Sequence, residues 1–202
     1  MTVGGIILCG GKSSRMGRAK ALLPVGEELM LQRVVRIVGS VLSPVVVVAA
    51  PEQELPDLPG RVIVARDERE HLGPLAGLRI GLEALQDKAD AGYCSSCDVP
   101  LLKVEFIEAV ISRLGDYDVV TPQEGRFYHP LAAVYRTSLA PIAAQLVAED
   151  RLRLMFLLDA VRTLAVDVDD LRTVDPALES LRNVNTPEEY SAVLEMLETD
   201  GS

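Results

Sequence analysis

The sequence has no tryptophan, and aromatic residues of all kinds make up only 4% of it. Proteins that bind single-stranded nucleic acid stack bases on aromatic side chains, so this scarcity argues against that function. The formal net charge of -10 argues against broad binding to nucleic acids or anionic membranes. The chain also lacks an apolar run long enough to cross a membrane. We therefore expect neither nucleic acid nor a membrane among its partners.

Cysteine and histidine are scarce as well, with three and two residues respectively. An odd number of cysteines fits a reducing cytoplasm, and the N-terminus lacks the basic region and the A-x-A-like site of a signal peptide, so we expect a cytoplasmic protein. Cys94 and Cys97 form a C-x-x-C pair. On a strand, residues three apart point to opposite faces, so we interpret them as buried small side chains and reject a redox or zinc site.

The chain does contain enough apolar sequence for a full core, because 49% of its 202 residues are hydrophobic. Short apolar runs alternate with segments of helical periodicity. Strands are predicted at 6–9, 45–50, 62–65, 92–96, 119–120, 131–135 and 164–168, and helices at 29–42, 78–85, 104–114, 141–148, 152–161 and after Thr186. This order predicts a three-layer, Rossmann-like α/β/α sandwich with a mostly parallel central sheet and an antiparallel late strand. We expect one domain over 1–198 and a frayed tail at 199–202.

The N-terminal stretch from Gly4 to Lys20 is the most informative part of the sequence. The predicted strand stops at Gly10 and Gly11, and Lys12, Arg15, Arg18 and Lys20 follow without an acidic residue before Glu27. A strand that runs into a glycine-rich, basic loop is a common way to bind phosphates. The spacing fits neither the P-loop nor the dinucleotide-binding G-x-G-x-x-G pattern. Solvated cations on the rim of a turn are the simpler alternative.

Two aspartates follow predicted strands, where ligands sit in open α/β sheets. Asp98 precedes Val99-Pro100 at a strand end, which suits a magnesium ligand, since magnesium takes one or two carboxylates together with substrate phosphates. Capping of the following turn is the alternative. Asp67 follows the third strand. Residues 73–77 are expected to form a turn that enters the next helix, although a helix start with close packing would have the same glycines.

Later segments carry polar residues with ordinary structural explanations. His129 begins a strand in His129-Pro130-Leu131, and a lone histidine is more often a structural hydrogen-bonding group than a catalyst. No Ser/His/Asp or Cys/His arrangement accompanies it, so nucleophilic catalysis is unsupported. Asn183 and Asn185 precede a helix that Thr186, followed by Pro187 and Glu189, would cap with a capping box.

Together these motifs resemble a known family. The pattern L-x-G-G-x-x-x-R-M-G-x-x-K is similar to the signature of the sugar-nucleotidyltransferase-like family, and it is met at Leu8, Gly10, Gly11, Arg15, Met16, Gly17 and Lys20. With C-D-x-P at Asp98, H-P-L at His129 and N-x-N-T-P-E from Asn183, the chain resembles the molybdenum cofactor guanylyltransferases from Gly5 to about Tyr190. These belong to the nucleotidyltransferase family, whose fold is glycosyltransferase-A-like.

The resemblance implies transfer of GMP from GTP to the phosphate of molybdopterin, with magnesium as cofactor and transient contact with cofactor-delivery or acceptor proteins. It implies catalytic roles for Arg15, Lys20 and Asp98, with Asp98 as the metal ligand. The implied nucleotide-binding residues are Leu8, Cys9, Gly10, Gly11, Lys20, Asp67 and Asp98, and the implied acceptor-binding residues are Asn183 and Asn185.

One departure from the family concerns the base. Some relatives carry Asn near the end of the second strand, where this chain has Val48-Ala49-Ala50. A cytidylyltransferase for the same cofactor is therefore an alternative. Two other classes, a P-loop-like ATPase and a non-catalytic nucleotide-binding regulator, are disfavoured by the failed P-loop spacing and by the presence of both Lys20 and Asp98.

Overall fold

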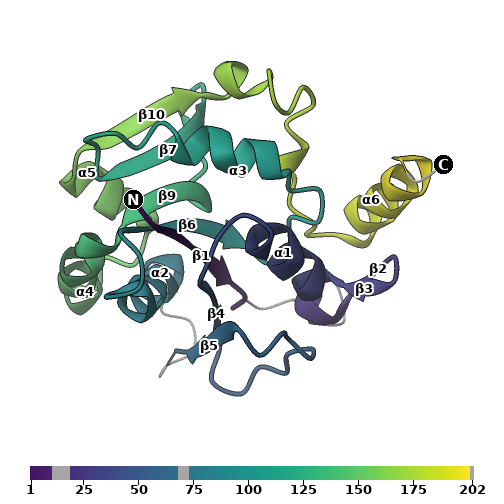
Figure 1. Ribbon diagram of the computed structural model, residues 1–202, viewed down its shortest axis with the longest axis horizontal. Coiled ribbons are helices and arrows are strands. Elements are labelled where there is room, and N and C mark those ends of the chain that lie inside the picture. Colours follow the sequence, from purple (N-terminus) through teal and green to yellow (C-terminus); the bar gives the residue numbers. More distant parts are fainter. Residues whose placement is uncertain (11–18, 68–72, 201–202) are drawn as a thin grey trace.

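The computed structural model describes residues 1–10, 19–67 and 73–200, and a central sheet of eight strands dominates it (Figure 1). The strands are β1 (Val3–Leu8), β4 (Val45–Ala49), β5 (Val62–Arg66), β6 (Ala91–Ser96), β7 (Val119–Glu124), β8 (Phe127–Tyr128), β9 (Ala132–Arg136) and β10 (Thr163–Asp167). Their order is β10-β7-β9-β6-β1-β4-β5, with β8 paired to β7. Because β1, β4, β5 and β6 are parallel and β9 runs antiparallel to both its neighbours, the predicted mostly parallel sheet with an antiparallel late strand is confirmed.

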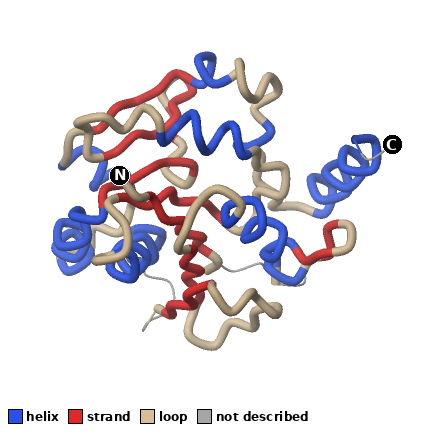
Figure 2. The backbone as a smooth tube through the Cα atoms, in the orientation of Figure 1, coloured by secondary structure: helices blue, strands red, loops and turns tan. Residues whose placement is uncertain are grey.

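Helices cover both faces of this sheet, as the tube view also shows (Figure 2). The helices α1 (Met30–Gly39) and α3 (Val104–Ile111) pack on one face, and α2 (Gly73–Leu85), α4 (Ala140–Ala148) and α5 (Leu154–Ala160) pack on the other. Alternate residues of a strand point to opposite faces, so Ile6 joins the α2 side and Ile7 the α1 side. The three-layer α/β/α prediction is therefore confirmed.

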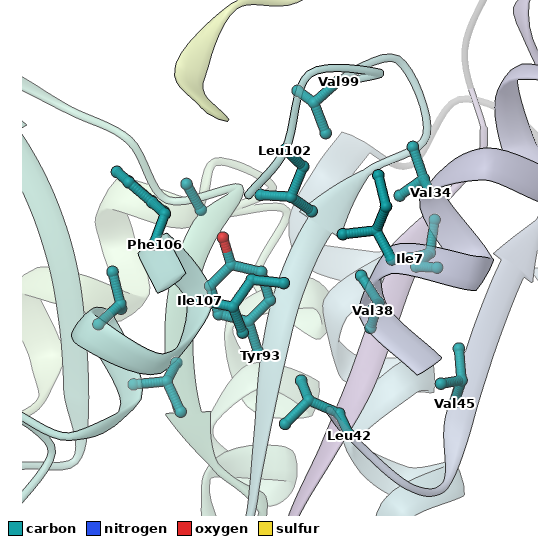
Figure 3. Close-up of a cluster of buried hydrophobic side chains, with 14 of the residues drawn as sticks. Ile7, Val34, Val38, Leu42, Val45, Tyr93, Val99, Leu102, Phe106 and Ile107 are labelled. Atoms are coloured by element: carbon teal, nitrogen blue, oxygen red, sulfur yellow. The ribbon is translucent and has the colours of Figure 1, made fainter. Parts of the chain in front are cut away.

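The core on the α1 side is a continuous apolar cluster, drawn in Figure 3. Val34 and Val38 of α1 and Phe106 and Ile107 of α3 meet the sheet there, around the fully buried ring of Tyr93. Apolar surface removed from water stabilises the fold by about 25 cal/mol per Å². This buried surface therefore holds α1 and α3 against the sheet.

A smaller apolar cluster joins the C-terminal helix to an N-terminal hairpin. The helix α6 (Pro187–Asp200) packs through Val193 near the hairpin of β2 (Pro24–Val25) and β3 (Glu28–Leu29). The capping box is confirmed, since Thr186 Oγ1 accepts from Glu189 N at 3.2 Å and a Glu189 carboxylate oxygen accepts from Thr186 N at 3.0 Å. The helix reaches Asp200, two residues into the tail that we expect to fray.

The structure corrects the interpretation of residues 73–77, which are the first turns of α2 and not a turn before it. Pro74 suits this position because the first helical N–H groups have no partner within the helix. The glycines serve close packing: a Cβ added to Gly81 would lie 2.4 Å from Ile6 Cγ2, and one on Gly77 would lie 3.3 Å from Leu8 Cδ2. The β2–β3 hairpin and the extension of β7 from Val120 to Glu124 were also not predicted.

The expected placement of the cysteine pair is confirmed. Cys94 is buried on the α2 side of the sheet and Cys97 on the α1 side, and neither is in a disulfide. Burial raises the pKa of the Cys94 thiol, which disfavours the reactive thiolate. Among the helices in the described parts of the chain, none is long and apolar enough to span a membrane.

Candidate active site

The parallel strands at the centre of the sheet end together, and the predicted site residues follow those ends. Leu8 of β1 is paired with Val48 of β4 and with Ser96 of β6. The ladder continues one step further, because Cys97 N donates to Leu8 O at 3.0 Å and Cys9 N donates to Val48 O at 2.8 Å. Cys9 and Cys97 are therefore next to each other, with Gly10 and Asp98 immediately beyond them. This is the sheet edge at which doubly wound proteins bind ligands.

Asp98 is the centre of a network of polar side chains. One carboxylate oxygen accepts a hydrogen bond from Lys20 Nζ at 2.6 Å, and the other accepts one from Asn183 Nδ2 at 2.7 Å. The hydroxyl of Ser96, two residues earlier, also donates to Asp98. The Asp98 side chain is only 11% exposed, so these donors take the place of the water that would otherwise solvate its charge.

Lys20 connects this carboxylate to the C-terminal segment. Its ammonium group also donates to Asn185 Oδ1 at 2.8 Å, across 165 residues of sequence. The segment is fixed there by its backbone, because Val184 N donates to Asp98 O at 2.9 Å. The last residue of the N-terminal signature, the aspartate of C-D-x-P and both asparagines of N-x-N-T-P-E thus meet in one place.

This group of side chains suits a polyanionic ligand with its counter-ion. Within 1–10, 19–67 and 73–200 the structure has no group of three or more His, Cys, Asp and Glu residues placed to hold a metal ion. A single carboxylate still fits magnesium, which keeps several waters and is commonly bound by one or two carboxylates together with substrate phosphates. Asp98 supplies that carboxylate, and Lys20 beside it supplies a positive charge for phosphate oxygens.

The residues predicted to contact the base and ribose lie at the end of β1 or directly after it, and Asp67 lies further along the same edge, beyond β4. Cys9 is buried, whereas Gly10 is exposed, and no heavy atom of the described residues lies within 4 Å of a Cβ added to it. Asp67 follows β5, and its N–H donates to Ala49 O at 3.0 Å. Because β4 and β1 lie between β5 and β6, Asp67 and Asp98 are on different parts of this edge. Their roles, with the nucleoside and with the metal, stay predictions.

Two predicted site residues, Gly11 and Arg15, lie outside the residues that the structure describes. Their implied contacts with the triphosphate stay predictions. They are joined in sequence to Gly10 on one side and Lys20 on the other, which the structure places at the same sheet edge.

His129 takes no part in the network around Asp98 that the structure describes. Its Nε2 lies 3.9 Å from a carboxylate oxygen of Glu124, beyond hydrogen-bond distance. Burial lowers the pKa of His129, and the Glu124 charge offsets this only in part. Among the described residues, the buried Nε2 has no hydrogen-bond partner, so the interpretation of His129 as a structural hydrogen-bonding group stays a prediction.

Sequence reasoning missed Ser96, Gln53 and Arg66 at this edge. Ser96 precedes Asp98 by two residues, and a hydroxyl at that spacing is a weak sign of local hydrogen bonding. Gln53 Nε2 donates to Cys9 O at 2.7 Å, and Arg66 donates to three carbonyl groups of the loop after β4. Neither contact has a sequence signal, because each joins residues from separate segments.

Comparison with known proteins agrees with this geometry. The family described as MobA-like NTP transferase domain matches residues 5–164. A probable molybdenum cofactor guanylyltransferase of Mycobacterium tuberculosis H37Rv is 42% identical over 190 residues, covering 90% of this chain and 88% of the relative.

Solved structures give the same result for the fold. The molybdopterin-guanine dinucleotide biosynthesis protein A of Archaeoglobus fulgidus superposes with a TM-score of 0.77 at 21% identity, covering 98% of this chain and all of that one. A protein of M. tuberculosis H37Rv crystallised in complex with manganese superposes with a TM-score of 0.63 at 16% identity, covering 96% of this chain and 99% of the other.

Proposed function

The chain belongs to the MobA-like NTP transferase family, and from that premise we propose that it transfers GMP from GTP to the phosphate of molybdopterin. The products are molybdopterin guanine dinucleotide and pyrophosphate. The observation that carries the proposal is the joining of Lys20, Asp98, Asn183 and Asn185 at one sheet edge. The identity of the substrates is inferred from the similarity to relatives named as probable molybdenum cofactor guanylyltransferases.

The reaction forms one phosphorus–oxygen bond and breaks another. An oxygen of the molybdopterin phosphate attacks the α-phosphorus of GTP, and the bond between the α- and β-phosphates breaks to release pyrophosphate. The attacking oxygen is already anionic, so a strong general base is not required. The barrier lies in bringing two polyanions together, and positioning and electrostatic stabilisation lower it.

The described residues have separate roles in this scheme. Lys20 holds triphosphate oxygens and offsets the charge that develops on the leaving group. Asp98 holds magnesium, which supplies positive charge to the phosphate oxygens when it is bound. Asn183 and Asn185 contact the acceptor, and Leu8, Cys9 and Gly10 contact the base and ribose. Gly11 and Arg15 complete the triphosphate site from the predicted loop.

Nucleotide binding tests the proposal directly. In a thermal-shift comparison of GTP, CTP and ATP, each with magnesium, we expect a shift for GTP alone. A ligand at about a hundred times its dissociation constant adds roughly 2.7 kcal/mol of stability, which such a measurement resolves. GTP and molybdopterin should then give the dinucleotide and pyrophosphate in equal amounts.

The other outcomes separate the alternatives. A shift for CTP alone would favour the cytidylyltransferase, for which the absence of an asparagine in Val48-Ala49-Ala50 is the relevant observation. If the protein binds GTP but forms no dinucleotide when molybdopterin is supplied, a non-catalytic regulator is favoured. Steady release of phosphate in the absence of any acceptor would favour an ATPase or GTPase.

A further inference from the structure

The backbone ladder between β1 and β4 is interrupted at the nucleotide end. Along this pair of strands, Gly5 N donates to Pro44 O and Cys9 N donates to Val48 O, which sets the register. In a parallel ladder with this register, the next bond would run from Ala50 N to Cys9 O. Both of these groups are instead bonded to the side chain of Gln53.

The Gln53 carboxamide takes the place of the missing backbone hydrogen bond between Ala50 N and Cys9 O. Its Nε2 donates to Cys9 O at 2.7 Å, and its Oε1 accepts from Ala50 N at 3.2 Å. The same Nε2 also lies 3.3 Å from Cys9 Sγ. A side-chain amide has the donor and acceptor of a peptide group. The Gln53 carboxamide therefore bridges Cys9 O and Ala50 N, which do not bond to each other directly.

Gln53 is itself held in place from both sides. Its own N–H donates to Ala50 O at 3.2 Å, which closes a turn after β4. From β5, Arg66 Nη1 donates to the carbonyl oxygens of Ala50, Pro51 and Gln53 at 2.8, 2.9 and 3.1 Å. The carboxamide is thus ordered by contacts within the chain, so little side-chain entropy remains to be lost when a ligand binds.

We propose that Gln53 is a positioning residue for nucleobase recognition. It fixes the spacing and direction of the Cys9 backbone, which contacts guanine and ribose in the proposed function, and the inference rests on that function. A carbonyl oxygen has two lone pairs, so Cys9 O can accept from Gln53 and still present an acceptor to a ligand. Guanine offers adjacent N–H donors on its pairing edge, whereas cytosine offers one amine beside two acceptors. A carbonyl held in one direction can accept from either of the adjacent guanine donors, but it can accept from cytosine only where the single amine is aligned with it.

The test compares Gln53→Glu and Gln53→Ala with the wild-type protein. Glutamate keeps the size of the side chain but has no N–H to donate to Cys9 O. Alanine removes both hydrogen bonds of the carboxamide, to Cys9 O and from Ala50 N. For both we expect the dissociation constant of GTP with magnesium to rise roughly tenfold or more, the scale for losing a well-placed hydrogen bond. The preference for GTP over CTP should fall, and turnover at saturating GTP should stay within about threefold of wild type, because the lost interaction acts on binding.

Gln32 provides a matched control in the same region. Its Oε1 accepts from Leu29 N and its Nε2 donates to Asp57 O, both at 2.9 Å, so it ties the same loop to α1 with the same kind of bridge. Gln32→Glu should lower the melting temperature about as much as Gln53→Glu while GTP affinity and nucleotide preference stay unchanged.

The outcomes separate this inference from the proposed function. If the wild-type protein binds GTP with magnesium, but the Gln53 variants keep its affinity and preference within about twofold, the function stands and Gln53 is only structural. An equal loss of GTP affinity in the Gln32 variant would likewise assign the effect to the loop as a whole and overturn the inference. If the wild-type protein does not bind GTP, both proposals fall.

Discussion

Two clusters in this molecule pair a lysine with a poorly exposed aspartate, and they differ in what surrounds the carboxylate. In the site cluster, Lys20 and Asp98 are 2.6 Å apart, and the other donors to Asp98 are side chains, from Asn183 and Ser96. In a second cluster, Lys103 lies 3.0 Å from Asp175, whose side chain is fully buried, and 2.7 Å from Glu179.

The second cluster is tied to the backbone. Asp175 Oδ2 accepts from Ser180 N at 2.7 Å, and Ser180 Oγ in turn accepts from Lys103 N, at the start of α3, at 3.0 Å. Burial alone would raise the pKa of Asp175, but the hydrogen bonds from Ser180 and Lys103 outweigh it and lower the pKa. These bonds fix the segment before α6 against α3.

The comparison shows how the same pair of residue types serves two purposes. Around Asp175, the backbone donor cannot leave without unfolding the segment. Around the Asp98 carboxylate, the donors in the described part of the chain are side chains, which can rotate away when a ligand offers them a better partner. In the proposed function, Lys20 would exchange Asp98 for phosphate oxygens, and Asp98 would exchange the ammonium for a metal ion. A cluster built for exchange should matter for turnover, and one built into the backbone should matter for stability.

Removal of the site pair is the strongest test of this difference. We expect Lys20→Ala and Asp98→Ala each to lower turnover by roughly a hundredfold or more, the scale for losing a major electrostatic group. Steady-state rates of dinucleotide formation measure the effect.

Lys103→Ala is the matched control, because it removes a lysine with two carboxylate partners from the other cluster. It should lower the melting temperature and keep turnover within about threefold. Near-normal turnover in either site variant would contradict the role of this cluster.

Much of the fold could be predicted because local sequence and tertiary position agree. Val45–Ala49 is a run of β-branched residues that ends in alanine, and all five residues are buried in a strand covered on both faces. Asp98 could be placed at the carboxyl edge because it follows the predicted strand 92–96 and precedes Pro100. Where a side chain packs across the sheet instead, local signals mislead. The glycines of residues 73–77 suggest a turn, but they lie in the first part of α2, where a Cβ on Gly77 would lie 3.3 Å from Leu8 Cδ2 of the sheet.

The candidate site was less accessible to sequence reasoning, since its bonds join distant segments. Lys20 meets Asn185 across 165 residues, and only the family resemblance placed them in one site. The contact of Gln53 with Cys9 spans 44 residues, and a glutamine in a polar loop carries no local sign of it. Periodicity predicts which face of an element is buried, but it does not predict which polar groups meet at the ends of strands.

The structural cluster gives the next largest expected effect, and this one is on stability. Asp175→Asn removes the charge that Lys103 pairs with while it keeps the shape of a fully buried side chain. We expect a loss of about 2 kcal/mol in the free energy of unfolding, the range for a hydrogen bond to a charged group that is left incompletely partnered. Urea denaturation measures it. Turnover of the folded variant at a temperature well below its transition should match wild type; a drop in turnover comparable to that of Asp98→Ala would erase the distinction between the two clusters.

The smallest effect concerns the pH dependence of the same carboxylate, and its sign follows from the lowered pKa. A group whose pKa is lower in the folded state stabilises the protein fully above its unfolded value, here near the ordinary 3.8, and this stabilisation is lost as the pH falls through the lower folded value. The difference in unfolding free energy between wild type and Asp175→Asn should therefore be constant at neutral pH and shrink as the pH falls from about 6 to about 3, through the ordinary value and toward the lowered folded pKa. Denaturation curves of both proteins across this range measure the difference. The other carboxylates titrate in both proteins, so their contributions cancel when one free energy is subtracted from the other. A difference that stays constant down to the lowest pH would mean that the charge of Asp175 contributes nothing and that its hydrogen-bonding shape alone holds the segment.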